Sequence, residues 1–134
     1  MLYPMFAMVL LTFAVAIHLF RLRVKAVKSG ELRLSQFRLN TGETPDAIVQ
    51  ASRNYTNLFE VPVLFYAAGL LAITLDLQTL ALMITAWLFV VARIIHSWIH
   101  LHGNNVIHRL RAYMLGNICV VLMWILIVLG YAAR

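Results

Sequence analysis

Four long stretches of this chain carry no Lys, Arg, Asp or Glu, and they constrain its fold more than any other feature. A helix needs roughly 20 mostly apolar residues to cross the hydrocarbon core of a bilayer. The first and last stretches meet this length outright, whereas the middle two meet it only by taking in Glu60 and Arg93. We therefore expect four transmembrane helices. The uncharged stretches are residues 1–20, 61–75, 77–92 and 112–133.

The composition also requires a membrane. Of the 134 residues, 63% are hydrophobic and only 12% are charged, with a mean hydropathy of +0.85. Soluble domains are usually about half apolar and about a quarter charged, and so short a chain cannot bury this much apolar surface in its own core. The first stretch has the small-x-small pattern Ala14-Val15-Ala16, but no basic region precedes it, so we expect a span rather than a cleaved signal. The fold predicted is a single all-α membrane domain over residues 1–134.

The net charge of +6 is unevenly distributed. Seven of the 11 Lys and Arg residues lie between Arg21 and Arg53, and Arg93, Arg109 and Arg111 flank the link between the third and fourth spans. The positive-inside rule then places the first and third links in the cytoplasm and both termini outside. No basic surface interleaved with aromatic residues appears, so we expect membrane lipids rather than nucleic acid as the partner of these charges.

Local signals set the expected helix boundaries. Ser29-Gly30 should end the first helix, and Thr44-Pro45-Asp46 has the hydroxyl, proline and acid typical of a helix start. Asp76-Leu77-Gln78 is long enough only for a tight turn between antiparallel helices, and Pro62 should kink the second helix. The helices are expected at about residues 2–28, 45–75, 79–100 and 106–133.

Polar residues inside these spans are the candidates for function, because burying them in a membrane is costly. At about 100° per residue, each of two sets falls within a strip of about 60° on its helix. Both strips lie toward the cytoplasmic ends of adjacent helices, so we expect them to form the walls of one polar site. The sets are Arg53, Asn57 and Glu60 on the second span, and Arg93, His96 and His100 on the third.

Two alternatives to a ligand site remain open. Glu60 could pair with Arg93 or Arg53 merely to hold the helices together, since buried charges need partners whatever their purpose. The surplus of positive charge over this single acid favours an external anion instead. Alternatively, His96 and His100 are four residues apart and could hold zinc or haem. Against this, the flanking glutamate of a protease motif is missing and Cys119 lies too deep to join.

Two motifs carry a resemblance to a known family. Arg53-x-x-x-Asn57-x-x-Glu60-x-Pro62, followed by an aromatic-rich apolar run, resembles the second-helix signature of the MAPEG family, the membrane-associated proteins of eicosanoid and glutathione metabolism. The segment from Ala92 to His96 is similar to the family's third-helix Arg-x-x-Tyr pattern, with histidine in place of tyrosine. The resemblance extends over essentially the whole chain and implies a short bacterial-type member, placed in the inner membrane.

The resemblance implies a homotrimer that binds glutathione between subunits near the cytoplasmic face. The tripeptide would contact Arg53, Asn57, Glu60 and Arg93, with His96 and His100 at the positions of family tyrosines. An arginine near the start of the last helix stabilises the thiolate in family transferases, and Arg109 is the first choice for it, with Arg111 second. Glutathione would then be the co-substrate and a lipophilic electrophile from the bilayer its acceptor. Because the family includes a member that binds without catalysing, a non-catalytic binding or accessory protein is the alternative function.

Overall fold

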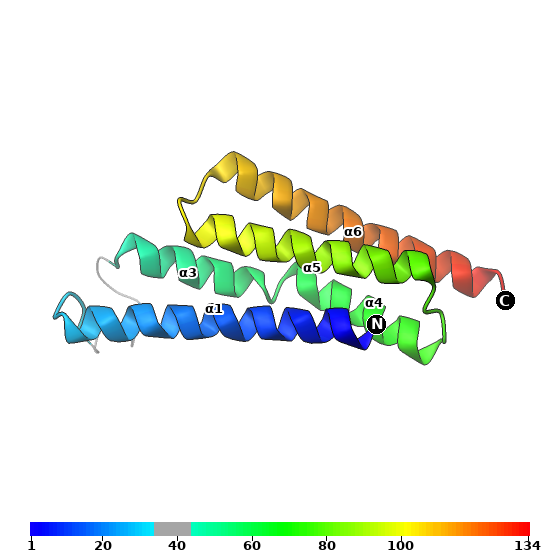
Figure 1. The fold of residues 1–134 in the computed structure, drawn as a ribbon, viewed down its shortest axis with the longest axis horizontal. Helices are drawn as coiled ribbons and strands as arrows, with labels where there is room; N and C mark the ends of the chain where they lie inside the picture. The colour runs from blue at the N-terminus through cyan, green and yellow to red at the C-terminus, as the bar shows by residue number, and fades with distance from the viewer. Residues whose placement is uncertain (34–43) are drawn as a thin grey trace.

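The computed structural model describes residues 1–33 and 44–134, and all the helices and turns reported below belong to these two ranges. The described helices pack lengthwise into an elongated bundle, shown in Figure 1. Four stretches of helix are long and apolar enough to span a membrane, which confirms the predicted all-α, four-span fold. The helices are α1 (Leu2–Lys28), α3 (Asp46–Asn57), α4 (Val61–Thr74), α5 (Leu80–Leu101) and α6 (Val106–Ala132).

The second span is not the single helix expected over about 45–75. It is divided into α3 and α4 at residues 58–60, and the interruption is visible in Figure 1. Pro62 occupies the first turn of α4, where its missing N–H is tolerated. That residue could not donate to the carbonyl of Leu58 if the helix were continuous, so the chain ends one helix and begins another. The break leaves Glu60 as the N-cap of α4 rather than on the same helix as Arg53.

The remaining boundaries follow local capping chemistry. The start of α3 lies one residue later than expected, with Pro45 as the N-cap, and its carbonyl accepts from the backbone of Ile48 at 2.9 Å. Thr79 caps α5 through its side chain, which accepts from the amide of Leu82. Asn105 caps α6 in the same way. Most of the polar link predicted after the first span, at residues 34–43, lies outside the described part of the chain.

Both chain ends lie at the same end of the bundle, as Figure 1 shows. The amine of Met1 donates to Gln78 Oε1 at 2.7 Å, beside the turn between α4 and α5. At the other terminus, Arg134 donates to the backbone carbonyls of Leu75 and Asp76 in that same turn. Because α5 begins beside this turn and runs along the bundle, the turn from α5 to α6 lies at the opposite end.

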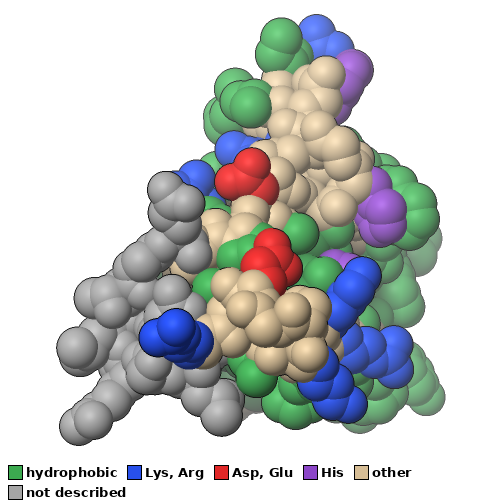
Figure 2. Space-filling view, turned by 90° about the vertical axis from the view of Figure 1, so that its left-hand side faces the viewer, with side chains coloured by type: hydrophobic (Ala, Val, Ile, Leu, Met, Phe, Trp, Pro, Cys, Tyr) green, Lys and Arg blue, Asp and Glu red, His purple; other side chains and the backbone are tan. Residues whose placement is uncertain are grey.

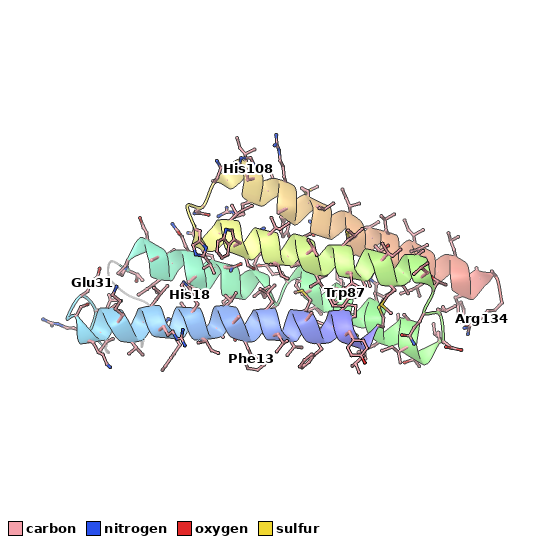
Figure 3. The ribbon with its side chains drawn as sticks, in the orientation of Figure 1. Phe13, His18, Glu31, Trp87, His108 and Arg134 are labelled. Carbon is pink, nitrogen blue, oxygen red and sulfur yellow. The ribbon has the colours of Figure 1, made fainter. Side chains whose placement is uncertain are left out.

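The core is apolar, and so is much of the surface. Phe65 of α4 stacks on Phe89 of α5 with ring centroids 4.5 Å apart, at the centre of the packed cluster. Large apolar side chains also point outward along the helices, for example Phe13, which is 63% exposed and projects away from α1 in Figure 3. Apolar surface of this extent is stable only against lipid. The chain is an integral, multi-pass membrane protein.

Candidate functional site

A pocket of about 460 Å³ opens between α3, α5 and α6 at the end of the bundle opposite the chain termini. Its size falls within the range of about 300–1,000 Å³ that is usual for small-molecule sites. Figure 2 looks onto this end of the molecule, where Lys, Arg and His side chains gather beside two acidic ones. The pocket is lined by Ser52, Arg53, Thr56, Asn57, Glu60, His96, His100, Val106, Arg109, Leu110 and Tyr113.

Most of the predicted site residues meet in this pocket. Two of them do not line it: Arg93 is fully buried behind the pocket, and Arg111 lies in a different groove, on another face of α6. The pocket thus keeps Arg109, the first choice for thiolate stabilisation, and leaves out the second choice. The predicted residues that line the pocket are Arg53, Asn57, Glu60, His96, His100 and Arg109.

Arg93 connects α5 to the end of α3. Its Nη2 atom donates to the backbone carbonyl of Asn57 at 3.0 Å and lies 3.3 Å from Asn57 Oδ1. Its Nε and Nη1 atoms have no partner among the described residues. Within that part of the chain, Arg93 forms no direct ion pair with Glu60, although the charge of Glu60 still acts on its guanidinium. Arg53 likewise lines the pocket without a direct ion pair to Glu60 among the described residues.

Arg109 is held in place by the turn that precedes α6. Asn104 adopts a left-handed conformation (φ 48°), and its Oδ1 atom accepts from Arg109 Nη1 at 2.6 Å. The same nitrogen lies 3.4 Å from His100 Nε2. The turn Gly103-Asn104 thus determines the position of the guanidinium at the mouth of the pocket, and its charge is available to an anion bound there.

The two histidines belong to this hydrogen-bonded cluster. His96 Nδ1 lies 3.1 Å from the backbone carbonyl of Arg109 and must donate to it, because a carbonyl oxygen only accepts. The rings of His96 and His100 are 5.7 Å apart and nearly perpendicular. Within residues 1–33 and 44–134, no group of three or more His, Cys, Asp or Glu side chains could hold a metal ion. The zinc or haem alternative therefore gains no further ligand from the described structure.

Tyr113 is the aromatic residue among the pocket residues that sequence reasoning missed. Its ring lies 5.7 Å from that of His96 and 5.7 Å from the guanidinium carbon of Arg93. The available signal was its spacing: Tyr113 follows Arg109 by four residues and so shares its helical face. A tyrosine thus lines the pocket from α6, whereas the family pattern has its tyrosine on the third span, where this chain has His96.

A pair of buried polar residues behind the pocket was also missed by sequence reasoning. Asn54 of α3 and Ser97 of α5 are both buried, and the serine hydroxyl donates to Asn54 Oδ1 at 3.2 Å. The Nδ2 atom of Asn54 has no partner within the described residues. Together with Arg93, this pair forms a polar seam that fixes α3 against α5, and the exposed residues of α3 are thereby presented to the pocket.

The pocket can bind a small molecule that carries both signs of charge. Arg53 and Arg109 supply positive charge, and Glu60 supplies one carboxylate that forms no direct ion pair within residues 1–33 and 44–134. Guanidinium groups bind carboxylates through paired, charge-assisted hydrogen bonds, and a carboxylate binds an ammonium group. Leu110 and Val106 add apolar surface on the α6 side. An amino acid or short acidic peptide with a free amine matches this combination.

The fold and the site together define a four-span membrane protein with a polar pocket at one end of its helical bundle. The family model of the MAPEG family matches residues 1–129 of the chain, which is nearly its full length. The protein belongs to the MAPEG family, and its function accordingly lies in membrane-associated glutathione or eicosanoid metabolism. No curated protein and no solved structure matches the chain.

Proposed function

We propose that this protein binds glutathione in the pocket between α3, α5 and α6 and transfers it to lipophilic electrophiles that arrive from the bilayer. The observation that carries the proposal is the convergence of Arg53, Glu60 and Arg109 in a single pocket within a chain of the MAPEG family. Glutathione has two carboxylates and one α-amine, which match two arginines and one glutamate. The positive-inside rule supports a cytoplasmic location for this end of the bundle.

The transfer begins with the thiol of glutathione. A nearby positive charge lowers the pKa of a thiol, and the thiolate is the nucleophile. Arg109 supplies that charge, and the Asn104 and His100 contacts limit where its guanidinium can lie. The thiol proton leaves to water, and the thiolate sulfur donates its electron pair to an electrophilic carbon, so that a C–S bond forms. The leaving group departs with the bonding pair, or the electrophile takes up a proton if addition occurs.

We expect the pocket to face both water and lipid, which suits a reaction between a polar and an apolar reactant. Leu110 of the pocket is 56% exposed, and Val106 is 62% exposed. In the membrane these side chains border the bilayer interface, where a lipophilic electrophile concentrates. We also propose that the protein is a homotrimer, as the family resemblance implies, so that the open side of each pocket is completed by a neighbouring subunit.

Thermal unfolding in detergent tests binding. Glutathione at 100 times its dissociation constant should stabilise the protein by about 2.7 kcal/mol and so raise its melting temperature. Glu60→Ala should abolish the shift, because the α-amine loses its partner, whereas Glu31→Ala, which removes a carboxylate that does not line the pocket, should retain it. The absence of a shift for the wild-type protein at millimolar glutathione would refute the proposal.

One observation favours binding without catalysis as a second candidate function. Arg109 Nη1 is already engaged by Asn104 at 2.6 Å and lies next to His100, so part of the guanidinium is occupied before any ligand arrives. Ultraviolet absorption of bound glutathione separates the two candidates. A thiolate band that disappears in Arg109→Ala supports transfer, and binding without a thiolate band supports the non-catalytic function.

A further inference from the structure

A second groove runs between α5 and α6 on a face of the hairpin that the glutathione proposal does not use. It has a volume of about 500 Å³, and none of the residues that line it also lines the pocket described above. Its floor is formed by Ala92 and Ala112, which are both buried. Because these side chains are small, they leave space between the helices that larger residues would fill.

The groove is polar at one end and apolar at the other. His102, at the end of α5, and His108, in the first turns of α6, lie at the polar end, beside the turn that joins the helices. Figure 3 shows His108 at this end of the molecule, projecting away from the bundle. Ile95 and Leu115 line the groove farther from the turn. Residues 92 and 102 are ten apart on a helix with a rise of about 1.5 Å per residue, so the groove is about 15 Å long.

The charge around the groove has one sign. Arg111 is exposed and lines the groove about one turn of α6 beyond His108. No Asp or Glu occurs in the sequence after Asp76, so α5, α6 and the turn between them carry no acidic side chain. An anion at Arg111 would therefore meet no repulsion from either helix.

At the polar end of the groove, His102 is held by stacking on Trp98. The rings of Trp98 and His102 stack with centroids 4.0 Å apart and planes 20° apart. His102 Nδ1 lies 3.1 Å from the carbonyl oxygen of Trp98, to which it must donate. Trp98 is 65% exposed, and exposed tryptophans of membrane proteins concentrate at the headgroup level of the bilayer. The polar end of the groove thus lies at the depth of lipid headgroups.

We propose that this groove binds an anionic phospholipid of the surrounding leaflet. Its phosphate lies at Arg111, between His102 and His108, and one acyl chain follows the alanine floor between Ile95 and Leu115. The groove is polar at headgroup depth and apolar farther into the bilayer, as a lipid in this leaflet is. A free phosphate would use only the polar end and would leave the apolar length unexplained. The proposal does not depend on the glutathione site.

Thermal unfolding of the detergent-solubilised protein, titrated with lipid, tests the proposal. Phosphatidylglycerol should raise the melting temperature at lower concentration than phosphatidylcholine with the same acyl chains. Arg111→Gln should weaken the apparent affinity for phosphatidylglycerol about tenfold, as expected for the loss of one charge-assisted contact. Arg111→Lys should restore part of it, since the charge returns without the guanidinium fork. Native mass spectrometry should detect phosphatidylglycerol retained by the wild-type protein and lost from Arg111→Gln.

Matched variants separate a specific groove from general charge attraction. Arg21→Gln removes the same charge from an exposed position on α1, and it should leave the affinity unchanged. Ala112→Leu should weaken binding by filling the floor, without changing any charge. Four results would overturn the proposal: equal stabilisation by both lipids, equal effects of Arg21→Gln and Arg111→Gln, full stabilisation by inorganic phosphate alone, or a disulfide between two copies of an Ile95→Cys variant showing that a second chain covers the groove.

Discussion

Arg93 of α5 donates to the backbone carbonyl of Asn57, the last residue of α3, at 3.0 Å. The carbonyls at the end of a helix lack partners within it, and a buried one must find a partner elsewhere. Here the break between α3 and α4 exposes the carbonyl, and a fully buried arginine from the neighbouring span satisfies it. The contact therefore holds the end of α3, including the pocket residue Asn57, against α5.

Arg93→Lys should destabilise the protein. The variant loses the Nη2 atom that contacts both oxygen atoms of Asn57, and the ammonium group of lysine is more strongly hydrated, so burying it costs more. We expect the free energy of unfolding to fall by about 1–3 kcal/mol, the cost of a buried polar group that loses its partner. Melting temperatures in one detergent measure the effect. Arg21→Lys, at an exposed position, is the control, and equal losses in both variants would contradict this role for Arg93.

The buried pair of Asn54 and Ser97 should behave non-additively. Ser97→Ala removes the donor 3.2 Å from Asn54 Oδ1 and leaves that oxygen unpaired, at a cost of about 1–3 kcal/mol. Replacing both residues, as in Asn54→Leu with Ser97→Ala, removes the unpaired groups together and should cost less than Ser97→Ala alone. A double-mutant cycle of unfolding free energies measures the coupling. If the effects are purely additive, the two side chains do not interact as described.

Close packing of α1 on α4 predicts a different response at two glycines. A Cβ atom at Gly69 would lie 2.7 Å from the sulfur of Met5, so this flexible side chain must move in Gly69→Ala, and we expect a loss of about 1 kcal/mol through overpacking. Adding Met5→Ala should recover most of this loss. At Gly116 the nearest atom, Cδ of Arg93, would be 3.5 Å away, an ordinary contact. Gly116→Ala is therefore the matched control, and it should be neutral or stabilise by up to about 1 kcal/mol through helix propensity.

Pro62→Ala should straighten the second span. The new N–H can donate to the carbonyl of Leu58, which allows α3 and α4 to join as one helix. Spin labels at Ala47 and Leu70 would then move apart toward about 35 Å, the length of 23 helical residues. Pro45→Ala, at the N-cap of α3, should leave the distance unchanged. An unchanged distance in Pro62→Ala would mean that packing, rather than proline, divides the span.

Much of the candidate site could be anticipated from spacing within single helices. Arg53 and Asn57 share a face of α3 because they are four residues apart, and His96 and His100 share a face of α5 for the same reason. Spacing could not reveal that Arg93 is buried behind the pocket, since that depends on how α5 is rotated against α3. Tyr113 was missed because its contacts cross from α6 to α5.

The sequence by itself determined that this protein is an all-α membrane protein with four spans. Hydropathy and charge are properties of each segment alone, so they predict the spans without knowledge of any contact. The tertiary structure alone decided that Arg93 is buried behind the pocket, that Arg109 rather than Arg111 enters the pocket, and that Arg111 lines a separate groove. These outcomes depend on helix rotation and on buried polar groups finding partners across the bundle, and such partners are set by packing rather than by position in the chain.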